Sequence, residues 1–166
     1  DLPSDNQGPI APRVSPTGAH WAHDSTGWWY ACASGTDYLK GGWFTINGSD
    51  YLFGPNGYMS TGFLQRPSGE WVYADSEGAL VGGWVSDGGS WYYMDPDTKV
   101  MRTGWRLDRG SWYYLTGSGA MAIGWVNDGG TWYFLNASGA MVTGTQWIDG
   151  ERHWFYGNGA WWGVWN

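Results

Sequence analysis

Residues 83–94 read GWVSDGGSWYYM, residues 104–115 read GWRLDRGSWYYL, and residues 124–135 read GWVNDGGTWYFL. All three segments begin with Gly-Trp, pass through an Asp and a Gly, and close with three aromatic residues followed by Met or Leu. The pattern returns every 20 to 22 residues along the chain. A fixed period of this length indicates a repeat protein, in which each unit buries its apolar side chains against the units before and after it.

Seven copies align from His20 onward, and each carries three aromatic positions. The first position is occupied by Trp21, Trp43, Phe63, Trp84, Trp105, Trp125 and Trp147. The second follows seven or eight residues later, at Trp28, Tyr51, Trp71, Trp91, Trp112, Trp132 and Trp154. The third comes two residues further on, at Tyr30, Phe53, Tyr73, Tyr93, Tyr114, Phe134 and Tyr156. Residues two apart lie on the same face of a strand, so we expect the second and third rings to share a face.

Turn-forming residues separate the aromatic positions of each copy. Pairs such as Asn47-Gly48 and Asp128-Gly129 lie between the first and second rings, where they favour a tight β-hairpin. A second turn, such as Ser118-Gly119, follows the third ring and leads to the next copy. Because an isolated hairpin is marginal in water, the hairpins must stack on one another. We therefore predict an all-β fold, a β-solenoid of about seven stacked β-hairpins with a repeat of 20 to 22 residues.

The repeats also define the domain organisation. Residues 1–18 contain four prolines among Ser, Gly and Asn and predict a linker, whereas residues 19–166 form the repeat module. Apolar residues after the second turn of each copy are expected to fill gaps between neighbouring hairpins. They are Met59, Leu80, Met101, Met121 and Met141, and the last copy has Trp161 and Trp162 instead, which is typical of an end cap.

The composition agrees with an aromatic β-repeat and argues against several classes of partner. The chain has 16 Trp and 29 Gly, which suits large rings on short strands joined by tight turns. Its formal net charge is -7 and its Lys and Arg residues are scattered, so we expect no nucleic-acid partner. No apolar run reaches membrane-spanning length, so we expect no membrane insertion.

The repeats closely resemble the choline-binding repeats, or cell wall-binding repeats, of bacterial and phage cell-wall proteins. The resemblance rests on the Gly-Trp start, the Gly-containing turn, the Trp-Tyr-Tyr strand and the Gly-x-Met return, and it covers residues from about 20 to 166. It implies a non-catalytic module, secreted or associated with the cell surface, that recognises choline groups of teichoic or lipoteichoic acid. Such a module would anchor a larger surface protein or murein hydrolase, with choline as ligand and with no cofactor and no metal.

Two related families leave the ligand open. The glucan-binding repeats of streptococcal glucosyltransferases and the carbohydrate-binding repeats of clostridial toxins look similar, and a fold does not by itself define a function. A glucan or other carbohydrate is therefore the alternative ligand, and a homodimer is an assembly that the sequence also leaves open.

The resemblance implies particular site residues. In the choline-binding family the ligand lies between consecutive hairpins, in a cage made by the two Trp of one repeat and the third-position Tyr of the next, often closed by a Met. The implied sites are Trp84, Trp91, Tyr114 and Met121; Trp105, Trp112, Phe134 and Met141; and Trp125, Trp132 and Tyr156. Weaker candidates, in copies that depart from the pattern, are Trp21, Trp28 and Phe53; Trp43, Tyr51 and Tyr73; and Phe63, Trp71 and Tyr93. The middle strand residues Tyr92, Tyr113 and Tyr133 should point to the opposite face and serve packing.

Aromatic rings suit a quaternary ammonium because their electron-rich faces attract its diffuse charge and its methyl groups. The same rings could instead form only the core of a structural spacer, in which case no ligand-sized gap would remain. Sugars would stack on some of the rings but would also need converging Asn, Asp or Gln side chains. The sequence reveals no such polar set.

Other polar residues suggest no catalytic or metal site. Recurring acidic residues lie where hairpin turns favour Asp, and we assign that role to Asp24, Asp87, Asp108 and Asp128. We expect His20, His23 and His153 to be exposed and Cys32 to be a small buried apolar residue. Neither a Ser-His-Asp or Cys-His arrangement nor a phosphate-binding loop stands in a recognisable context, so we expect no enzyme.

Overall fold

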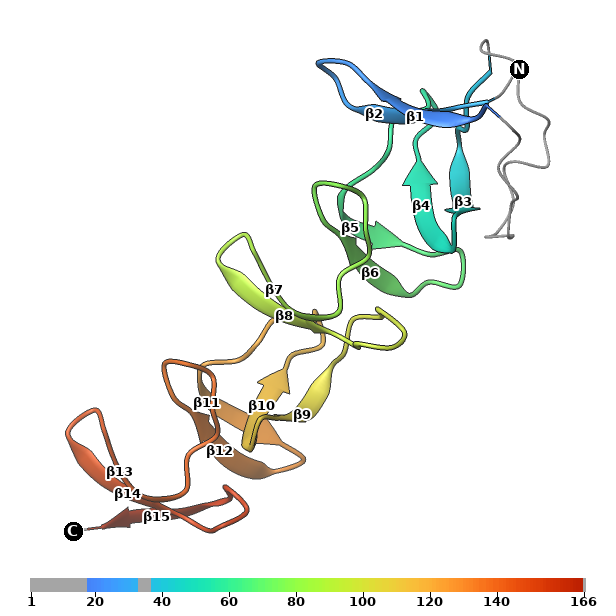
Figure 1. The fold of residues 1–166 in the computed structure, drawn as a ribbon. Helices are drawn as coiled ribbons and strands as arrows, with labels where there is room; N and C mark the ends of the chain where they lie inside the picture. The colour runs from blue at the N-terminus through green and yellow to red at the C-terminus, as the bar shows by residue number, and fades with distance from the viewer. Residues whose placement is uncertain (1–17, 33–36, 166) are drawn as a thin grey trace. The chain divides into compact units, whose positions relative to one another are not determined.

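The computed structural model describes residues 18–32 and 37–165, and within these ranges it contains fifteen β-strands and no helix (Figure 1). The strands are β1 His20–His23, β2 Trp28–Ala31, β3 Gly42–Ile46, β4 Ser49–Phe53, β5 Gly62–Gln65, β6 Trp71–Ala74, β7 Gly83–Asp87, β8 Ser90–Met94, β9 Gly104–Asp108, β10 Ser111–Leu115, β11 Gly124–Asp128, β12 Thr131–Leu135, β13 Gly144–Ile148, β14 Glu151–Phe155 and β15 Trp161–Trp165. The predicted all-β fold is confirmed. The predicted linker lies, up to residue 17, outside the described residues.

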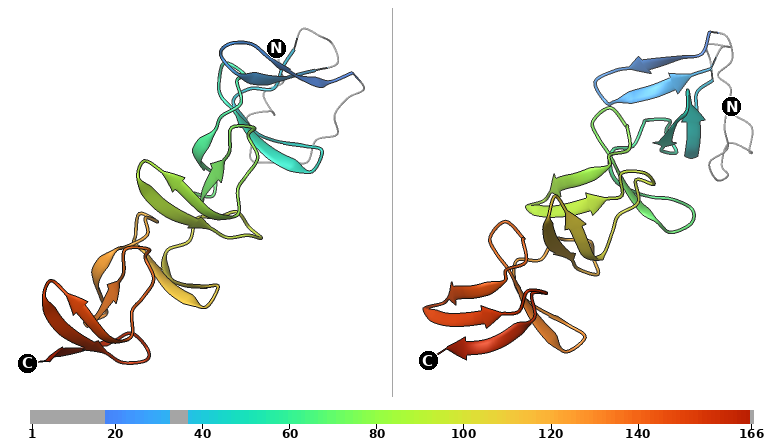
Figure 2. Two further views of the ribbon diagram at one scale, coloured as in Figure 1. Left: turned by 60° about the vertical axis from the view of Figure 1, so that its left-hand side comes forward. Right: turned by 60° about the horizontal axis from the view of Figure 1, so that its bottom comes forward.

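Consecutive strands pair in antiparallel hairpins, which Figures 1 and 2 show as separate small ribbons. In the described part of the chain seven hairpins form, from β1–β2 to β13–β14, and β15 adds a third strand to the last one. In β9–β10, for example, Gly104 lies opposite Leu115 and Trp105 lies opposite Tyr114. Because each hairpin is its own sheet, ladder hydrogen bonds join the two strands of a hairpin, and side-chain packing must do most of the work of joining neighbouring hairpins.

Tight turns connect the two strands of each hairpin, at or next to the positions that the sequence predicts. Asn47 and Gly48 have φ angles of 49° and 82°, and Arg109 and Gly110 have φ angles of 49° and 84°. Two consecutive positive φ angles are typical of a type I′ turn, whose twist matches that of the flanking strands. In β11–β12 the positive pair is Gly129-Gly130 rather than the predicted Asp128-Gly129, because Asp128 still pairs with Thr131 in the ladder.

The return segment after each hairpin reaches back to an earlier one. Met121 bridges Leu115 of its own copy, and its backbone N–H donates a hydrogen bond to the carbonyl oxygen of Trp91 at 2.7 Å. The same bond joins Met141 to Trp112 at 2.8 Å and Met59 to Trp28 at 2.7 Å. Each of these Met residues therefore lies beside the second ring of the preceding hairpin.

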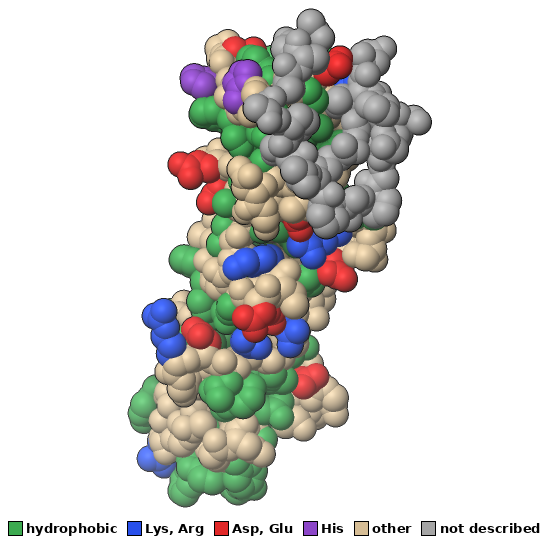
Figure 3. All heavy atoms as spheres, turned by 45° about the vertical axis from the view of Figure 1, so that its right-hand side comes forward, with side chains coloured by type: hydrophobic (Ala, Val, Ile, Leu, Met, Phe, Trp, Pro, Cys, Tyr) green, Lys and Arg blue, Asp and Glu red, His purple; other side chains and the backbone are tan. Residues whose placement is uncertain are grey.

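The chain forms two compact units, one of residues up to 83 together with 94–101, and one of residues 84–93 together with those from 102 onward. The first unit has core clusters formed by Tyr30, Leu39, Phe44, Ile46 and Phe53, and by Trp43, Leu64, Val72 and Ala74. The second unit has a cluster of Val142, Ile148 and Phe155. Many other rings stay at the surface, where Figure 3 shows hydrophobic side chains beside charged ones.

Candidate aromatic cage sites

Two tryptophans of one hairpin form the first walls of each candidate site. Trp84 lies in β7 and Trp91 in β8, and Trp84 packs against Tyr93 with ring centroids 5.1 Å apart. Residues two apart share a strand face, so Trp91 and Tyr93 lie on the same face of this hairpin as Trp84. The side chain of Trp91 is 46% exposed, which leaves its ring accessible to a ligand.

The next hairpin supplies the third ring. The ring comes from the face of that hairpin opposite to the face of Tyr114, which the sequence predicts as the third wall. Tyr113 of β10 meets Trp84 with ring centroids 5.0 Å apart and ring planes at 69°. Tyr114, the expected partner, packs instead against Trp105 of its own hairpin, at 5.0 Å. Neighbouring strand residues point to opposite faces, and a hairpin between two others presents one face to each. The middle residue of the strand, expected only to pack, therefore becomes a wall of the cage.

Met121 completes this arrangement. We number the cages along the chain and call this one the second cage, because another lies nearer the N-terminus. Trp84, Trp91, Tyr113 and Met121 line a cavity of about 460 Å³, together with Gly89, Ile123, Ala137 and Ser138. The backbone bond from Met121 to Trp91 holds these two residues beside each other. The cavity is large enough for a small organic ligand and is walled mostly by apolar groups.

The third cage repeats the arrangement one hairpin later. Trp105, Trp112, Tyr133 and Met141 line a cavity of about 340 Å³ with Gly157 and Asn158. The centroids of Trp105 and Tyr133 are 4.9 Å apart. Phe134, the expected third ring, packs against Trp125 of its own hairpin at 5.1 Å.

The first cage lies in the first unit. Trp21, Trp28, Tyr51 and Met59 line a cavity of about 400 Å³, and Glu77 places a carboxylate at its wall. Tyr51 meets Trp21 at 4.9 Å, whereas the expected Phe53 is buried and stacks on Trp21 at 5.7 Å. Tyr51 is therefore the middle residue of its strand, equivalent to Tyr113, and not a second-position ring. A complete ring set thus occurs where the sequence offered only weaker candidates.

The last hairpin is shifted by two residues relative to the sequence alignment. Counting from the Gly that opens each hairpin, Thr145 stands where Trp125 stands in the preceding copy, and Trp147 is 73% exposed. Tyr156 lies beyond the end of β14, where it contacts Trp154 at 5.0 Å. It does not join Trp125 and Trp132.

The rings that do surround Trp125 differ from those of the three cages. Trp132 lies 6.4 Å away, His153 5.3 Å and Trp161 5.7 Å. The Trp161 indole N–H donates a hydrogen bond to Nδ1 of His153 at 3.1 Å. His153 is only 7% exposed, so the prediction of an exposed histidine is wrong here, because this residue occupies the inward-facing middle position of β14.

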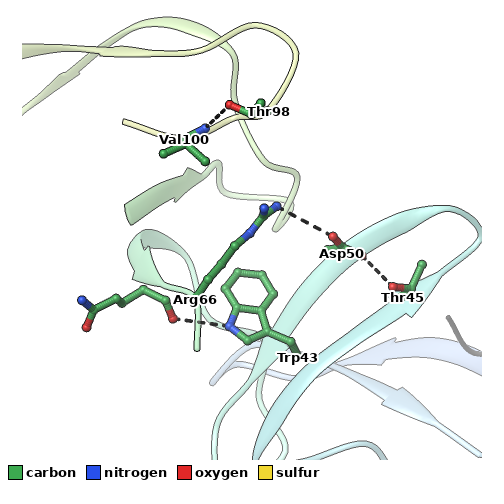
Figure 4. Close-up of polar contacts among 7 residues, drawn as sticks. Trp43, Thr45, Asp50, Arg66, Thr98 and Val100 are labelled. Atoms are coloured by element: carbon green, nitrogen blue, oxygen red, sulfur yellow. Dashed lines mark hydrogen bonds and ion pairs between the residues drawn. The ribbon is translucent and has the colours of Figure 1, made fainter. Parts of the chain in front are cut away.

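A polar cluster replaces the cage after the second hairpin (Figure 4). The position equivalent to Trp112 holds Asp50, which accepts a hydrogen bond from Thr45 Oγ1 at 2.6 Å and lies 3.8 Å from the Arg66 guanidinium. Trp43 is buried and its indole N–H donates to the Gln65 carbonyl oxygen at 3.4 Å. Trp43, Tyr51 and Tyr73 are therefore not brought together.

The remaining weaker candidates are also distributed differently from the expectation. Tyr73 packs against Phe63 of its own hairpin at 4.9 Å, and Tyr93 packs against Trp84 as described above. Trp71 is exposed, and its carbonyl oxygen accepts the backbone N–H of Met101 at 2.8 Å. Third-position rings thus pack repeatedly within their own hairpins.

Two of the turn aspartates have a further partner. The indole N–H of Trp84 donates to Oδ2 of Asp108 at 3.0 Å, and that of Trp105 donates to Oδ2 of Asp128 at 3.0 Å. Each carboxylate belongs to the hairpin that follows the tryptophan. Asp108 and Asp128 therefore fix the orientation of a cage wall, a role that the sequence interpretation missed because it needs the distance between two hairpins.

Among residues 18–32 and 37–165, no group of three or more His, Cys, Asp or Glu side chains is arranged to hold a metal ion. Over the same described ranges, no helix of sufficient length and apolarity to cross a membrane is found.

Two family models match parts of the chain. Residues 102–143 match the model of the choline-binding repeat, and residues 41–59 and 82–97 match the model of the cell wall binding repeat. A search of curated protein sequences finds no match.

Solved structures from Streptococcus pneumoniae resemble the chain along most of its length. CbpJ of strain TIGR4 is 38% identical, with a TM-score of 0.70 over 86% of this chain and 51% of that chain. Choline binding protein F is 34% identical, with a TM-score of 0.70 over 89% and 52%, and the modular autolysin LytC is 29% identical, with a TM-score of 0.68 over 87% and 33%. This chain thus spans about half or less of the proteins it resembles. With its hairpin repeats, the chain belongs to the family of choline-binding, cell wall-binding repeat proteins.

Proposed function

We propose that this module binds the choline groups of teichoic or lipoteichoic acid through its aromatic cages. The observation that carries the proposal is that two Trp, one Tyr and one Met recur around a cavity between three different pairs of hairpins. Rings that served only as a core would close on one another and would not leave cavities of about 340 to 460 Å³.

The walls suit a trimethylammonium group. This group cannot donate a conventional hydrogen bond, so it is recognised by ring faces that attract its charge and by apolar atoms that contact its methyl groups. Each ring contributes ~0.5 to 2 kcal/mol, and after the cost of association three rings give a site of roughly millimolar affinity.

Several weak cages in one module gain strength from a polymeric ligand. Teichoic acids present repeated choline groups, so that binding at one cage makes the next event intramolecular. Such multivalency raises apparent affinity by about 10² to 10⁴ without any new contact. The repetition of the hairpins is therefore directly useful for retention at a cell wall.

The module on its own is inferred to be a non-catalytic targeting part of a larger protein at the bacterial surface. The similarity to part of a modular autolysin supports this inference, because this chain covers only 33% of that protein. We infer that the parent is a surface protein or murein hydrolase held at the wall by these repeats.

A titration followed by tryptophan fluorescence and thermal unfolding tests the proposal. Millimolar choline should quench the fluorescence and raise Tm, because a ligand that binds only the folded cages stabilises them. Failure of choline to act up to ~100 mM, together with glucan oligosaccharides quenching the cage tryptophans, would favour the glucan-binding alternative.

A further inference from the structure

A separate cavity of about 340 Å³ lies in the first unit and is lined by Asp24, Trp29, Tyr38, Asn56 and Tyr58. It shares no lining residue with any of the three cages. Trp29 is the middle residue of β2, and its neighbours Trp28 and Tyr30 point to the other face of the strand. Trp29 lines none of the three cages.

Two rings of this pocket are absent from the later copies. Tyr58 follows the Gly of the second turn, a position held by Ala79, Ala120, Ala140 and Ala160 in other copies. Tyr38 bridges Ala31 as Met121 bridges Leu115, so it stands where the later copies place a Met or Leu. Since the other hairpins fold with small or flexible residues at these positions, the fold itself does not require the two tyrosines.

A fixed carboxylate lies against these rings. Asp24 Oδ1 accepts the backbone N–H groups of Thr26 and Gly27 at 2.8 and 3.2 Å, and Oδ2 accepts the hydroxyl of Tyr58 at 2.8 Å. The Tyr58 bond, followed by the backbone bonds, lowers the pKa of Asp24, so the group is an ionised acceptor at neutral pH. The turn thus presents a carboxylate whose position is set before any ligand arrives.

The pocket also holds an amide and perpendicular aromatic walls. Asn56 Oδ1 accepts the backbone N–H of Tyr58 at 3.3 Å, which orients the side-chain amide, whose nitrogen can donate hydrogen bonds. The rings of Trp29 and Tyr58 stand at 89° with centroids 6.1 Å apart. An apolar ring face with a few fixed polar groups is the usual composition of a site for a ligand that has both kinds of surface.

We propose that this pocket, which we call the glycan pocket, binds a pyranose ring of a neutral glycan. The sugar's C–H face would lie on the aromatic walls, its hydroxyls would donate to Asp24, and the Asn56 amide would donate to a hydroxyl oxygen. A quaternary ammonium group has no atom that can accept a hydrogen bond from the amide, whereas sugar hydroxyls can donate to the carboxylate and accept from the amide. The module would then hold choline and a glycan strand at different places, and this inference does not depend on whether the cages bind choline.

Assigned ¹⁵N NMR spectra of the indole N–H groups test the pocket directly. The protein is titrated with chitotetraose and, separately, with isomaltotetraose, each in the presence and in the absence of saturating choline. At least one sugar should shift the Trp29 signal under both conditions and leave those of Trp91 and Trp112 unchanged. Tyr58→Ala should raise the Kd for that sugar by about tenfold or more. It introduces the residue that other copies carry, so the fold should survive, as unchanged Trp91 and Trp112 indole signals of the same sample would show.

Trp91→Ala is the matched control, because it alters the second cage and should leave the sugar Kd unchanged. Three results would overturn the inference: no Trp29 shift up to ~50 mM of either sugar, sugar-induced shifts confined to the cage tryptophans, or an unaltered sugar Kd in the Tyr58→Ala variant. A Trp29 shift produced by choline at the concentrations that fill the cages would also overturn it, since the pocket would then be another cation site.

Discussion

The indole nitrogen of Trp84 donates a hydrogen bond to the carboxylate of Asp108, 3.0 Å away in the following hairpin. The same pair recurs one copy later, between Trp105 and Asp128 at 3.0 Å. A bond across the hairpin interface fixes the tilt of an indole that would otherwise be held only by packing. The acidic residues of the turns therefore contribute to the ring geometry of the second and third cages.

Asp108→Ala should weaken choline binding at the second cage, because the Trp84 ring loses the partner that orients it. The expected loss is about 1 kcal/mol, or roughly fivefold in Kd, which is typical of a hydrogen bond with a charged partner that is partly open to water. Indole NMR titration of Trp84 and Trp105 would report the two cages separately. Asp108→Asn keeps an acceptor and should restore most of the affinity.

Asp87→Ala is the control for this experiment, since Asp87 holds the same turn position in its copy but is not the acceptor of the Trp84 indole N–H. It should leave the Kd of the second cage unchanged. Equal weakening by Asp87→Ala and Asp108→Ala would mean that turn integrity, rather than the indole bond, sets the affinity.

Tyr113→Ala should abolish choline binding at the second cage within the millimolar range, since it removes the ring that lines the cavity beside Trp84. Tyr113→Phe should bind nearly as well, because the ring face is kept. Tyr114→Ala should spare the second cage, as this ring packs against Trp105. The reverse pattern, with Tyr114 essential and Tyr113 dispensable, would contradict the geometry described above.

Tyr51→Ala should remove one bound choline, because Tyr51 is the third ring of the first cage. Trp43→Ala should leave the number of bound cholines unchanged while lowering the free energy of unfolding by about 3 to 5 kcal/mol, as expected for truncation of a buried Trp. Calorimetry gives the stoichiometry, and urea unfolding gives the stability. If the Trp43→Ala variant kept a native fold and lost a bound choline while Tyr51→Ala did not, the polar cluster around Asp50 would itself be a site.

Tyr58→Phe should raise the pKa of Asp24 toward its ordinary value of 3.8, because the variant lacks the hydroxyl that stabilises the carboxylate. A carboxyl group with a lowered pKa in the folded state stabilises the fold above its unfolded pKa, and this contribution is lost as pH falls through the lowered value. At about pH 6 the wild type should therefore gain more unfolding free energy from Asp24 than the variant does. Under strongly acidic conditions this difference should vanish, because the carboxyl group is then protonated in both proteins. Carboxyl ¹³C NMR follows the titration, and identical Asp24 curves in both proteins would disprove the linkage.

The period of the sequence is enough to predict the hairpins and two of the walls of each later cage. Trp84 and Trp91 belong to one hairpin, so a tight turn and a spacing of seven residues place them together without knowledge of any neighbour. The third wall comes from another hairpin, and its identity depends on which face that hairpin turns toward the cage. The alternation of faces along β10 contains this answer, since Tyr113 and Tyr114 cannot both point at the preceding hairpin.

An alignment based on aromatic residues rather than on glycines assigns the wrong positions in the last and second copies. Counting from Gly144 gives Thr145 the first position, and counting from Gly42 gives Asp50 the second position and Tyr51 the middle one. The bonds from Trp84 to Asp108 and from Tyr58 to Asp24 join residues in different copies. Contacts of this kind depend on how one hairpin is stacked on another, which the repeat pattern alone does not determine.

Calorimetric titration with choline and with its uncharged isostere 3,3-dimethylbutanol tests the central claim, recognition of a quaternary ammonium by aromatic cages, most directly. The two ligands have almost the same shape, and only choline carries the charge that ring faces attract. We predict that at least three cholines bind per chain and that choline binds about five- to thirtyfold more tightly than the isostere, which corresponds to about 1 to 2 kcal/mol per site. Equal affinities for the two ligands would show that the cages are merely apolar slots and would contradict the account.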